Sequence, residues 1–525
     1  MKKSMRLGLF IALCLSMCLS VAFAAETIAE TEPNDSFSGA QRIAVQTVVN
    51  GVLDSKKDVD SYRLELPESG CVRVAFEHEY VDTSSTLWAV TLMDGDNTEL
   101  VTYEIPGSKT RFLSEPMGLP AGTCFVRVSD YYTSGKANTP YSLKLEYEPS
   151  DAWEKELNET FGKANRIALN KTVSGTIRTK DDRDYYRFDL EAPGAVSVVL
   201  NHEYLETGEN RWQATLYSED SVPLYTQGFV GKKTKNVCDP VGLPAGTYFL
   251  CMESYYKSTG ALSDIPYQLT MDYTASDDWE RELNDTFPSA TRIRTNQTYS
   301  GTVKDKEDVD FYAFDLEDGP GCVTLSFSHE YLETSESRWK LTVYDGDNVE
   351  MVTWAVAGKG SKSTFMPIGL PGGRYYLRIE SYYKSSGAFS STPYAFCLTY
   401  APDEEWEKEF NDTFSAANRL EAGAEVSGSV MHGKDADFYR VEIPKEGMYA
   451  LSFRHEYIDT SENRWKVTVY NADNAEVTRL NVKGNETRTA LETSLSAGTC
   501  YIKVENYYTG GSAASDVYQV TLIPQ

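Results

Sequence analysis

Apolar and polar residues alternate along many short segments of this chain, as in the stretch "CVRVAFEHEY" from Cys71 to Tyr80. A period of two places the apolar side chains on one face of a β-strand and the polar side chains on the other. One such face holds Val72, Val74, Phe76, His78 and Tyr80, and the matching face of a later segment holds Tyr449, Leu451, Phe453, His455 and Tyr457. Strands with one buried and one wet face, joined by turns such as "LPAG", predict antiparallel β-sandwiches of about seven or eight strands each.

The same series of segments recurs four times. A phenylalanine that follows an acidic motif marks each copy, at Phe37, Phe161, Phe287 and Phe414, so the copies are 124, 126 and 127 residues apart. This period is the length of a whole domain and is too long for a solenoid repeat. We therefore expect an all-β chain of four tandem domains, at residues 26–148, 149–274, 275–400 and 401–525.

Residues 1–25 predict a secretory signal peptide. "MKKSMR" is a basic start, "LGLFIALCLSMCLSV" is an apolar stretch, and "AFA" at Ala22–Ala24 is a small-residue cleavage pattern. A lipoprotein signal is disfavoured because neither Cys14 nor Cys18 follows a small residue. No later apolar run reaches membrane-spanning length. We expect a protein that a bacterial cell secretes by the Sec route.

The chain is strongly acidic, with a formal net charge of −28 that becomes −31 when Lys2, Lys3 and Arg6 leave with the signal peptide. This charge argues against nucleic acid and anionic membranes as partners and suits divalent cations. Seven cysteines follow the signal peptide, an odd number at positions that are not shared by all four copies, so we expect no disulfide framework to define the fold.

Each copy begins with a dense group of oxygen-bearing side chains. In the first copy, Glu30, Glu32, Asn34 and Asp35 fall within six residues, and an Asp-x-Asp-x-Tyr element follows with Asp58 and Asp60. If the fold places this turn beside the acidic motif, the cluster offers enough oxygens for Ca²⁺, which takes six to eight. The corresponding predicted calcium ligands are Glu154, Glu156, Asn158, Glu159, Asp182 and Asp184; Glu280, Glu282, Asn284, Asp285, Asp308 and Asp310; and Glu407, Glu409, Asn411, Asp412, Asp435 and Asp437.

The motif also has a purely structural interpretation. Asn and Asp cap helices and turns, so "NDTFSAANRL" could start a short helix and Asp-x-Asp could be turn chemistry alone. The joint recurrence of both elements in all four copies favours calcium. Glu159 replaces an aspartate in the second copy, and its longer side chain changes the expected geometry there.

Four histidines occupy one repeat position, in "HEY" segments: His78, His202, His329 and His455. A zinc-protease motif needs a second histidine four residues later on a helix, and neither condition is met. We expect core histidines that bond to a neighbouring strand. With no Gly-x-Ser-x-Gly elbow and no papain-type cysteine context, the sequence predicts a protein without a catalytic site.

Two aromatic features recur outside the core pattern. A tryptophan precedes the acidic motif in copies two to four, at Trp153, Trp279 and Trp406, and copy one has Ala29 there, which favours packing of each Trp on the preceding domain. Double tyrosines offer exposed aromatic surface for a ligand, with rim packing of the sandwich as an equal alternative. These pairs are Tyr131 and Tyr132, Tyr255 and Tyr256, Tyr382 and Tyr383, and Tyr507 and Tyr508.

The segments "EPNDSFSGAQRI", "DVDSYRLELPESG", "GLPAGTCFVRV" and "YSLKLEY" resemble the bacterial pre-peptidase C-terminal domain. That module commonly trails secreted proteases and is similar to the collagen-binding domains of clostridial collagenases. The resemblance covers essentially the whole mature chain, four times over. It implies a jelly-roll-like sandwich in which the acidic linker and the Asp turn hold calcium, at the four residue sets given above.

One position departs from that family. Relatives often carry a further acid three residues before the last Asp of the turn, where this chain has Lys57, Asp181, Glu307 and Lys434. The resemblance therefore implies weaker calcium binding, or binding through fewer ligands, in copies one and four. The "HEY" block is less typical of the family, and the sequence assigns it no function.

Taken together, these features predict a secreted, non-catalytic array of calcium-stabilised modules that attaches avidly to an extracellular polymer, either protein or polysaccharide. The first alternative is a structural spacer with no ligand except calcium. The second, less favoured, is an enzyme such as a glycosidase that uses paired carboxylates. The sequence gives neither the identity of the polymer nor the oligomeric state.

Overall fold

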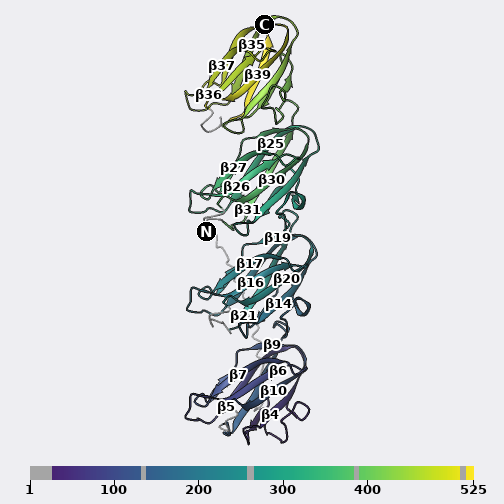
Figure 1. Cartoon of the computed structure of the whole chain (residues 1–525), viewed down its shortest axis with the longest axis vertical. Coiled ribbons are helices and arrows are strands. Elements are labelled where there is room, and N and C mark those ends of the chain that lie inside the picture. The colour runs from purple at the N-terminus through teal and green to yellow at the C-terminus, as the bar shows by residue number, and fades with distance from the viewer. Residues whose placement is uncertain (1–25, 132–136, 257–264, 384–389, 509–515) are drawn as a thin grey trace, which may run out of the picture. The chain divides into compact units, whose positions relative to one another are not determined.

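The computed structural model describes residues 26–131, 137–256, 265–383, 390–508 and 516–525. The predicted signal peptide and Tyr132 lie outside these residues. The chain divides into two compact units, of which the first consists mainly of residues up to Asn158 together with residues 174–179. The first unit contains copy one, and most of copies two to four belong to the second (Figure 1).

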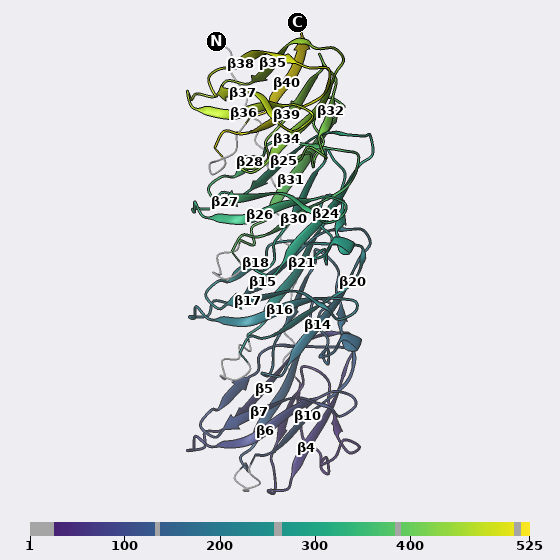
Figure 2. The same ribbon diagram turned by 45° about the horizontal axis from the view of Figure 1, so that its top comes forward.

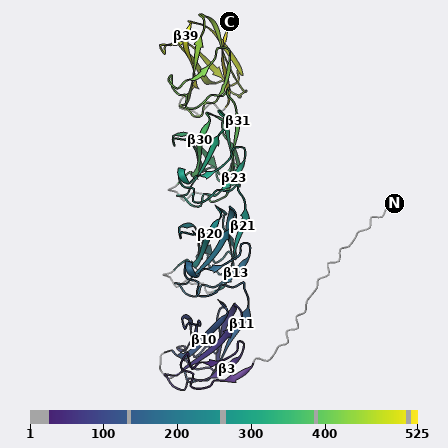
Figure 3. The same ribbon diagram turned by 90° about the vertical axis from the view of Figure 1, so that its right-hand side faces the viewer.

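Copy one is built from two β-sheets. The first sheet has the order β1 (Thr27–Ala29), β3 (Val48–Gly51), β11 (Tyr141–Pro149), β5 (Gly70–His78) and β8 (Arg111–Leu113), with β9 (Met117–Leu119) also paired to β5. The second has the order β2 (Gln41–Arg42), β4 (Val59–Leu66), β10 (Gly122–Asp130), β6 (Thr86–Met93) and β7 (Glu99–Pro106). In Figure 3 the strands β10 and β11, one from each sheet, lie on opposite sides of the copy.

Copies two and three repeat this plan. In copy two, one sheet has the order β12 (Asn165–Arg166), β14 (Arg183–Leu190), β20 (Gly246–Ser254), β16 (Asn210–Ser218) and β17 (Pro223–Val230). The other sheet has the order β13 (Thr172–Gly175), β21 (Tyr267–Ala275), β15 (Gly194–His202) and β18 (Lys235–Val237), and β19 (Val241–Leu243) also pairs with β15. In copy three, one sheet has the order β22 (Thr291–Arg292), β24 (Val309–Leu316), β30 (Gly373–Ser381), β26 (Ser337–Tyr344) and β27 (Glu350–Ala357). The other sheet has the order β23 (Thr298–Gly301), β31 (Tyr394–Pro402), β25 (Gly321–His329) and β28 (Lys362–Thr364), and β29 (Ile368–Leu370) also pairs with β25.

Copy four differs at one edge, where a single strand, β38 (Arg488–Leu495), replaces the two short edge strands of the other copies. It pairs with β35 (Gly447–His455) in the sheet that continues through β40 (Tyr518–Pro524) to β33 (Glu425–Gly428). The other sheet has the order β32 (Asn418–Leu420), β34 (Ala436–Ile443), β39 (Gly498–Asn506), β36 (Asn463–Tyr470) and β37 (Glu476–Lys483), and Figure 2 shows the last three side by side.

The predicted all-β fold of tandem sandwiches is confirmed, with two corrections. Each copy has nine to eleven described strands, more than the seven or eight expected, because several have only two or three residues. The pairing is also not wholly antiparallel: β1 pairs with β3, and β2 with β4, in parallel. The predicted domain boundaries stay a prediction.

The core of each copy lies between its two sheets. Apolar residues of both sheets form it, and each copy places one tryptophan there with no exposed surface: Trp88, Trp212, Trp339 and Trp465. One part of the predicted pattern is wrong. Strand β5 ends at His78, so Tyr80, two residues later, does not reach the core and is 63% exposed. Tyr457 in copy four is equally exposed for the same reason.

Helical structure is nearly absent from the described residues. Two single turns of 3-10 helix, η1 (Phe161–Lys163) and η2 (Phe287–Ser289), begin at the motif phenylalanines of copies two and three. The residue that caps each turn is the threonine before the phenylalanine, so the motif asparagines are not helix caps. None of the described helices is long and apolar enough to cross a membrane.

The acidic segment of each later copy contacts the edge of the copy before it. Within the second unit, the backbone N–H of Glu282 donates to the carbonyl oxygen of Gly242 in β19 (3.0 Å), and Glu409 makes the same bond to Gly369 in β29 (3.1 Å). The edge residue must be glycine, because a Cβ on Gly369 would lie 2.2 Å from the backbone oxygen of Glu407.

The linker tryptophans are half-buried, and their backbones bridge to a serine of their own copy, as Trp279 does to Ser300. Packing of the Trp side chains on the preceding copy stays a prediction.

The seven cysteines of the described residues are free thiols. Four of them are buried: Cys124, Cys238, Cys251 and Cys500.

Candidate metal centre

The fold places the acidic motif directly beside the Asp-x-Asp turn. In copy four the carbonyl oxygen of Asn411 accepts a hydrogen bond from the backbone N–H of Phe438 in β34 (3.1 Å). On the other side, Oε1 of Glu407 accepts one from the backbone N–H of Ser429, just after β33 (2.6 Å). The motif is therefore tied to both sheets of its own copy, at the end where the Asp turn enters β34.

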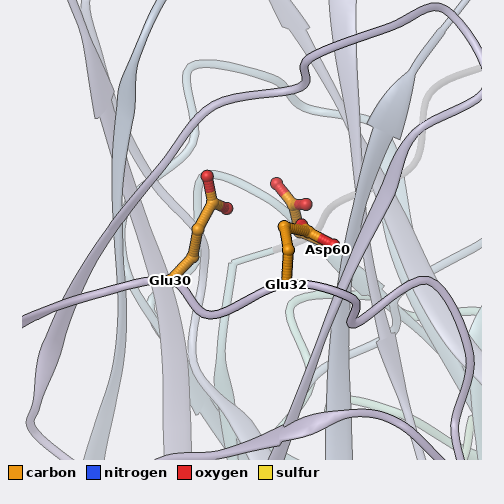
Figure 4. Close-up of side chains that lie close together, drawn as sticks. All are labelled: Glu30, Glu32 and Asp60. Carbon is orange, nitrogen blue, oxygen red and sulfur yellow. The ribbon is translucent and has the colours of Figure 1, made fainter.

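Copy one has the same arrangement. The backbone N–H of Val52 donates to Oε1 of Glu30 (2.8 Å), and that of Ser61 donates to the carbonyl oxygen of Asn34 (3.2 Å). Figure 4 shows the side chains of Glu30, Glu32 and Asp60 gathered above the chain. One carboxylate oxygen from each of these three residues lies within 4.8 Å of the other two.

Copies three and four bring together the equivalent carboxylates within the same distance. These groups are Glu280, Glu282 and Asp310, and Glu407, Glu409 and Asp437. Three carboxylates at this separation would repel one another unless protons or a cation balance their charge. The requirement that the two sequence elements meet at one end of a module is thus satisfied.

Burial separates the predicted ligands into two groups. Those at most 6% exposed are Asn34, Asp60, Glu154, Glu156, Asn158, Asp182, Asp184, Glu280, Glu282, Asn284, Asp308, Asp310, Glu407, Glu409, Asn411, Asp435 and Asp437. The residue after each asparagine is only half-buried in copies two to four (Glu159, Asp285 and Asp412) and is exposed in copy one (Asp35). Glu32 is also exposed, and Glu30 and Asp58 are half-buried, so copy one has the most open cluster.

A pair of buried tyrosines supports each cluster, and the sequence reasoning missed its role. In copy three, Tyr394 at the start of β31 donates to Oδ2 of Asp310 (2.7 Å), and its hydroxyl oxygen lies 2.7 Å from that of Tyr312. The hydroxyl of Tyr312 donates weakly to Glu280 (3.4 Å). The sequence signal was the tyrosine that opens the last strand of every copy, at Tyr141, Tyr267, Tyr394 and Tyr518.

Several buried oxygens of copy four have no hydrogen-bond donor. They are Oε1 of Glu409, Oδ1 of Asn411, Oδ1 of Asp435 and Oδ1 of Asp437, on side chains that are 0–6% exposed. Buried polar atoms are normally satisfied, because leaving one unpaired costs about 1–3 kcal/mol. Four unpaired oxygens on three carboxylates and one amide are the donor set that a hard divalent cation such as Ca²⁺ prefers. The residues of copy four therefore fit a calcium ion.

Burial raises the pKa values of these carboxyl groups. It raises the pKa of Glu409 to about 10 and that of Asp435 to about 8, with the neighbouring carboxylates adding to the effect. In copy one, burial raises the pKa of Asp60 to about 8, and the charge of Glu30 contributes in the same direction. Without a cation, these groups retain protons near neutral pH.

Copy three contains a buried lysine beside the same carboxylates. Burial raises the pKa of Glu282 to about 7 and that of Asp308 to about 6, and in both cases the ammonium of Lys304 opposes the shift. Burial alone would lower the pKa of Lys304, but these two carboxylates outweigh it and the pKa is raised.

The four repeat histidines are core residues, as expected. Each is 8% exposed and lies on a strand, with its ring centroid 4.2–4.3 Å from that of the core tryptophan. Their expected bond to a neighbouring strand is mostly replaced by a local one: Nδ1 of His78 bonds to the carbonyl oxygen of Glu79 (2.7 Å). Two of the four do bond to another strand: Nε2 of His202 lies 3.5 Å from Nδ2 of Asn236 in β18, and Nε2 of His455 bonds to the carbonyl oxygen of Lys483 in β37 (3.1 Å).

The double tyrosines are partly exposed, so both of their predicted roles stay open. Tyr255 and Tyr256 are 37% and 36% exposed, and their rings meet edge to face with centroids 4.7 Å apart. The pairs Tyr382–Tyr383 and Tyr507–Tyr508 have the same geometry. Tyr131 is half-buried and donates to Glu104 (2.8 Å).

Comparison with known proteins gives partial matches to collagenases. The chain is 28% identical over 242 residues to collagenase ColA of Clostridium perfringens and 24% identical over 240 residues to collagenase ColT of Clostridium tetani. These matches cover 44% and 45% of this chain but only 21% and 23% of the collagenases, so the chain spans less than a quarter of the relatives it matches. No protein-family model matches the chain.

Among solved structures, the chain is similar to the pre-peptidase C-terminal domain of a collagenase from Bacillus anthracis, with 18% identity, a TM-score of 0.17, and coverage of 21% of this chain and 94% of that one. It is also similar to tandem CBM51 modules of a family 98 glycoside hydrolase from Streptococcus pneumoniae, with 6% identity, a TM-score of 0.15, and coverage of 44% and 85%. The expected resemblance to collagenases is confirmed by the partial matches to ColA and ColT.

Proposed function

We propose that this chain is a secreted, non-catalytic binding protein whose calcium-stabilised sandwiches attach to an extracellular polymer, either protein or polysaccharide. The observation that carries the calcium part is the set of four buried, unpaired oxygens in copy four, at a place where the sequence repeats the same ligand types in every copy. The similarity to collagenases supports the polymer part, because ColA and ColT are named for an activity on collagen.

Repetition supplies the affinity in this proposal. A module that binds weakly becomes an avid binder when several copies act on one repetitive polymer, since later contacts form at high effective concentration. The tyrosine pairs of copies two to four supply aromatic surface at one equivalent place in each of these copies, and such surface packs on peptide or sugar rings at low entropic cost.

The test is binding of the mature chain to collagen fibrils and to a glycan array, with calcium and with a chelator. Alanine in place of both tyrosines in copies two, three and four should weaken binding at least tenfold, because each copy then loses its aromatic surface. Tyr331→Ala is the matched control, since Tyr331 is 59% exposed but lies outside the pairs. Equal binding by the pair variant and the control would contradict the assigned surface.

A structural spacer is the second candidate, and one observation favours it. The acidic segment contacts the preceding copy through Gly242 and Gly369, so the same segment that gathers the carboxylates also joins neighbouring copies. A pure spacer would bind neither fibrils nor glycans under any condition. A glycosidase would hydrolyse a glycan and lose that activity when an acid pair is replaced.

A further inference from the structure

One repeat position beside the acidic cluster differs in charge among the four copies. It lies three residues after the glycine that ends β3, β13, β23 and β33, just before the Asp turn. The residues at this position are Asp54, Arg178, Lys304 and Met431.

In copy three this residue places a cation among the ligands. Nζ of Lys304 lies 2.6 Å from Oε1 of Glu282 and 3.4 Å from Oδ1 of Asp308, and the side chain of Lys304 is only 6% exposed. Lysine is almost never buried unless its charge is paired. The ammonium is thus a fixed internal counter-ion of the cluster.

The two oxygens that Lys304 contacts are the equivalents of unpaired oxygens in copy four. Oε1 of Glu282 corresponds to Oε1 of Glu409, and Oδ1 of Asp308 corresponds to Oδ1 of Asp435. Met431 stands at the place of the lysine and brings no charge. The ammonium of copy three therefore takes up two of the four ligand atoms that copy four leaves for an external cation, while the equivalents of the other two, on the asparagine and on the last aspartate, stay unpaired.

Copy two also contains a buried cation beside its acidic cluster, but there it is an arginine. Nε of Arg178 lies 2.8 Å from Oε1 of Glu156, and the two side chains are 7% and 0% exposed. A guanidinium keeps its charge at any ordinary pH, so it neutralises this glutamate permanently.

Copy one resembles copy four. Its residue at this position, Asp54, adds a negative charge, and both polar atoms of the fully buried Asn34 amide lack partners, as does Oδ1 of Asp60. The nearby Lys57 is exposed, and no ion pair links it to these acids in the described part of the chain.

We propose that copies one and four bind a divalent cation such as Ca²⁺, whereas copies two and three are held together by their own buried cation and bind none. This assignment rests on the proposed calcium function and refines it. The residues Lys57, Asp181, Glu307 and Lys434 imply weaker calcium binding in copies one and four, and the assignment reverses that order. Those four side chains are all exposed, outside the buried clusters.

The test is the number of calcium ions that the mature full-length chain binds, measured by isothermal titration calorimetry and by equilibrium dialysis with metal analysis. The expected value is two ions per chain. Met431→Lys should reduce it to one, because the new ammonium takes the position of the ion. Lys304→Met should raise it to three, because it gives copy three the residue of copy four.

The additional calcium ion expected in Lys304→Met keeps the test decisive even if Met431→Lys folds poorly. Four ions in the wild-type chain, or an unchanged number in Lys304→Met, would overturn the division between copies while leaving calcium binding in place. No binding by the wild-type chain or by either variant at millimolar calcium would overturn the calcium function itself. Lys306→Met, which changes an exposed lysine in the same turn, should leave the number at two.

Discussion

Replacing Lys304 by methionine should destabilise copy three when calcium is absent and restore it when calcium is present. The substitution removes the ammonium that lies 2.6 Å from Glu282 and 3.4 Å from Asp308, and leaves two buried carboxylates without a counter-ion. Removing one partner of a buried ion pair costs about 3–5 kcal/mol. The pair is almost fully buried, so solvent screening does not reduce this figure much.

Calcium should recover most of that loss. An ion present at 100 times its dissociation constant stabilises the folded state by about 2.7 kcal/mol, and at 1,000 times by about 4.1 kcal/mol. The variant should therefore show a calcium-dependent stability in copy three that the wild-type chain lacks there.

Hydrogen exchange with peptide-level mass spectrometry is the suitable assay, because it reports on copy three within the intact chain. The amides of β24, which follows the Asp turn, and of β30, which pairs with β24, should exchange roughly 100-fold faster or more in the calcium-free variant, as follows from a loss of about 3 kcal/mol. The matched control is Lys306→Met, whose lysine is exposed and pairs only loosely with Glu307 (3.8 Å). Equal exchange in the two variants without calcium would refute the role given to the buried ammonium.

Three further outcomes are expected. Burial raises the pKa of Glu409 to about 10 and that of Asp435 to about 8, so the contribution of these groups to stability is complete below about pH 4 and is lost as the pH rises through those values. The calcium-free chain should therefore melt at a lower temperature at pH 8 than at pH 5. A melting temperature that rises with pH would contradict this. Tyr394→Phe removes the hydroxyl that donates to Asp310 and should cost about 1–3 kcal/mol in denaturant unfolding, with no change counting against the supporting role of the tyrosine pair. Gly369→Ala places a Cβ against the backbone of the following acidic segment and should cost about 1–3 kcal/mol; a wild-type melting profile would show that this edge contact adds nothing.

The pH prediction depends on every charged or titratable group that faces the cluster of copy four. Besides Glu409 and Asp435, these are Glu407, Asp412, Asp437, Tyr439 and Tyr518. The negative charges of Glu407 and Asp412 raise the pKa values of both Glu409 and Asp435. Added calcium should displace the protons of these groups, which makes its affinity rise with pH.

The fold was largely predictable because its signals are local and repeated. Alternation in a stretch such as Cys71–Tyr80 identifies a strand, and four copies of the same series establish a tandem array. The end of a strand was less predictable, since nothing in the alternation marks His78 as the last residue before the chain leaves the sheet. The two-residue and three-residue strands at the sheet edges were missed for a similar reason, because they are too short to show a period.

The gathering of the acidic side chains could be predicted from the sequence, whereas the buried counter-ions could not. Glu282 and Asp308 repeat in every copy as acids, and repetition drew attention to them. Lys304 sits in a polar turn and differs between copies, and a lysine in a turn usually lies in solvent. Only the three-dimensional arrangement shows that its ammonium enters the buried cluster.

The buried thiols have a consequence for the chemical stability of the folded chain. Burial raises the pKa of Cys124, Cys238, Cys251 and Cys500 to about 12, so on the order of one thiol in 100,000 is ionised at pH 7. Since oxidants and disulfides react with the ionised form, these four thiols react slowly while the chain is folded. These four thiols are protected from unwanted cross-linking only as long as each sandwich stays folded. The packing of the sandwiches therefore protects the covalent structure of the chain at these positions.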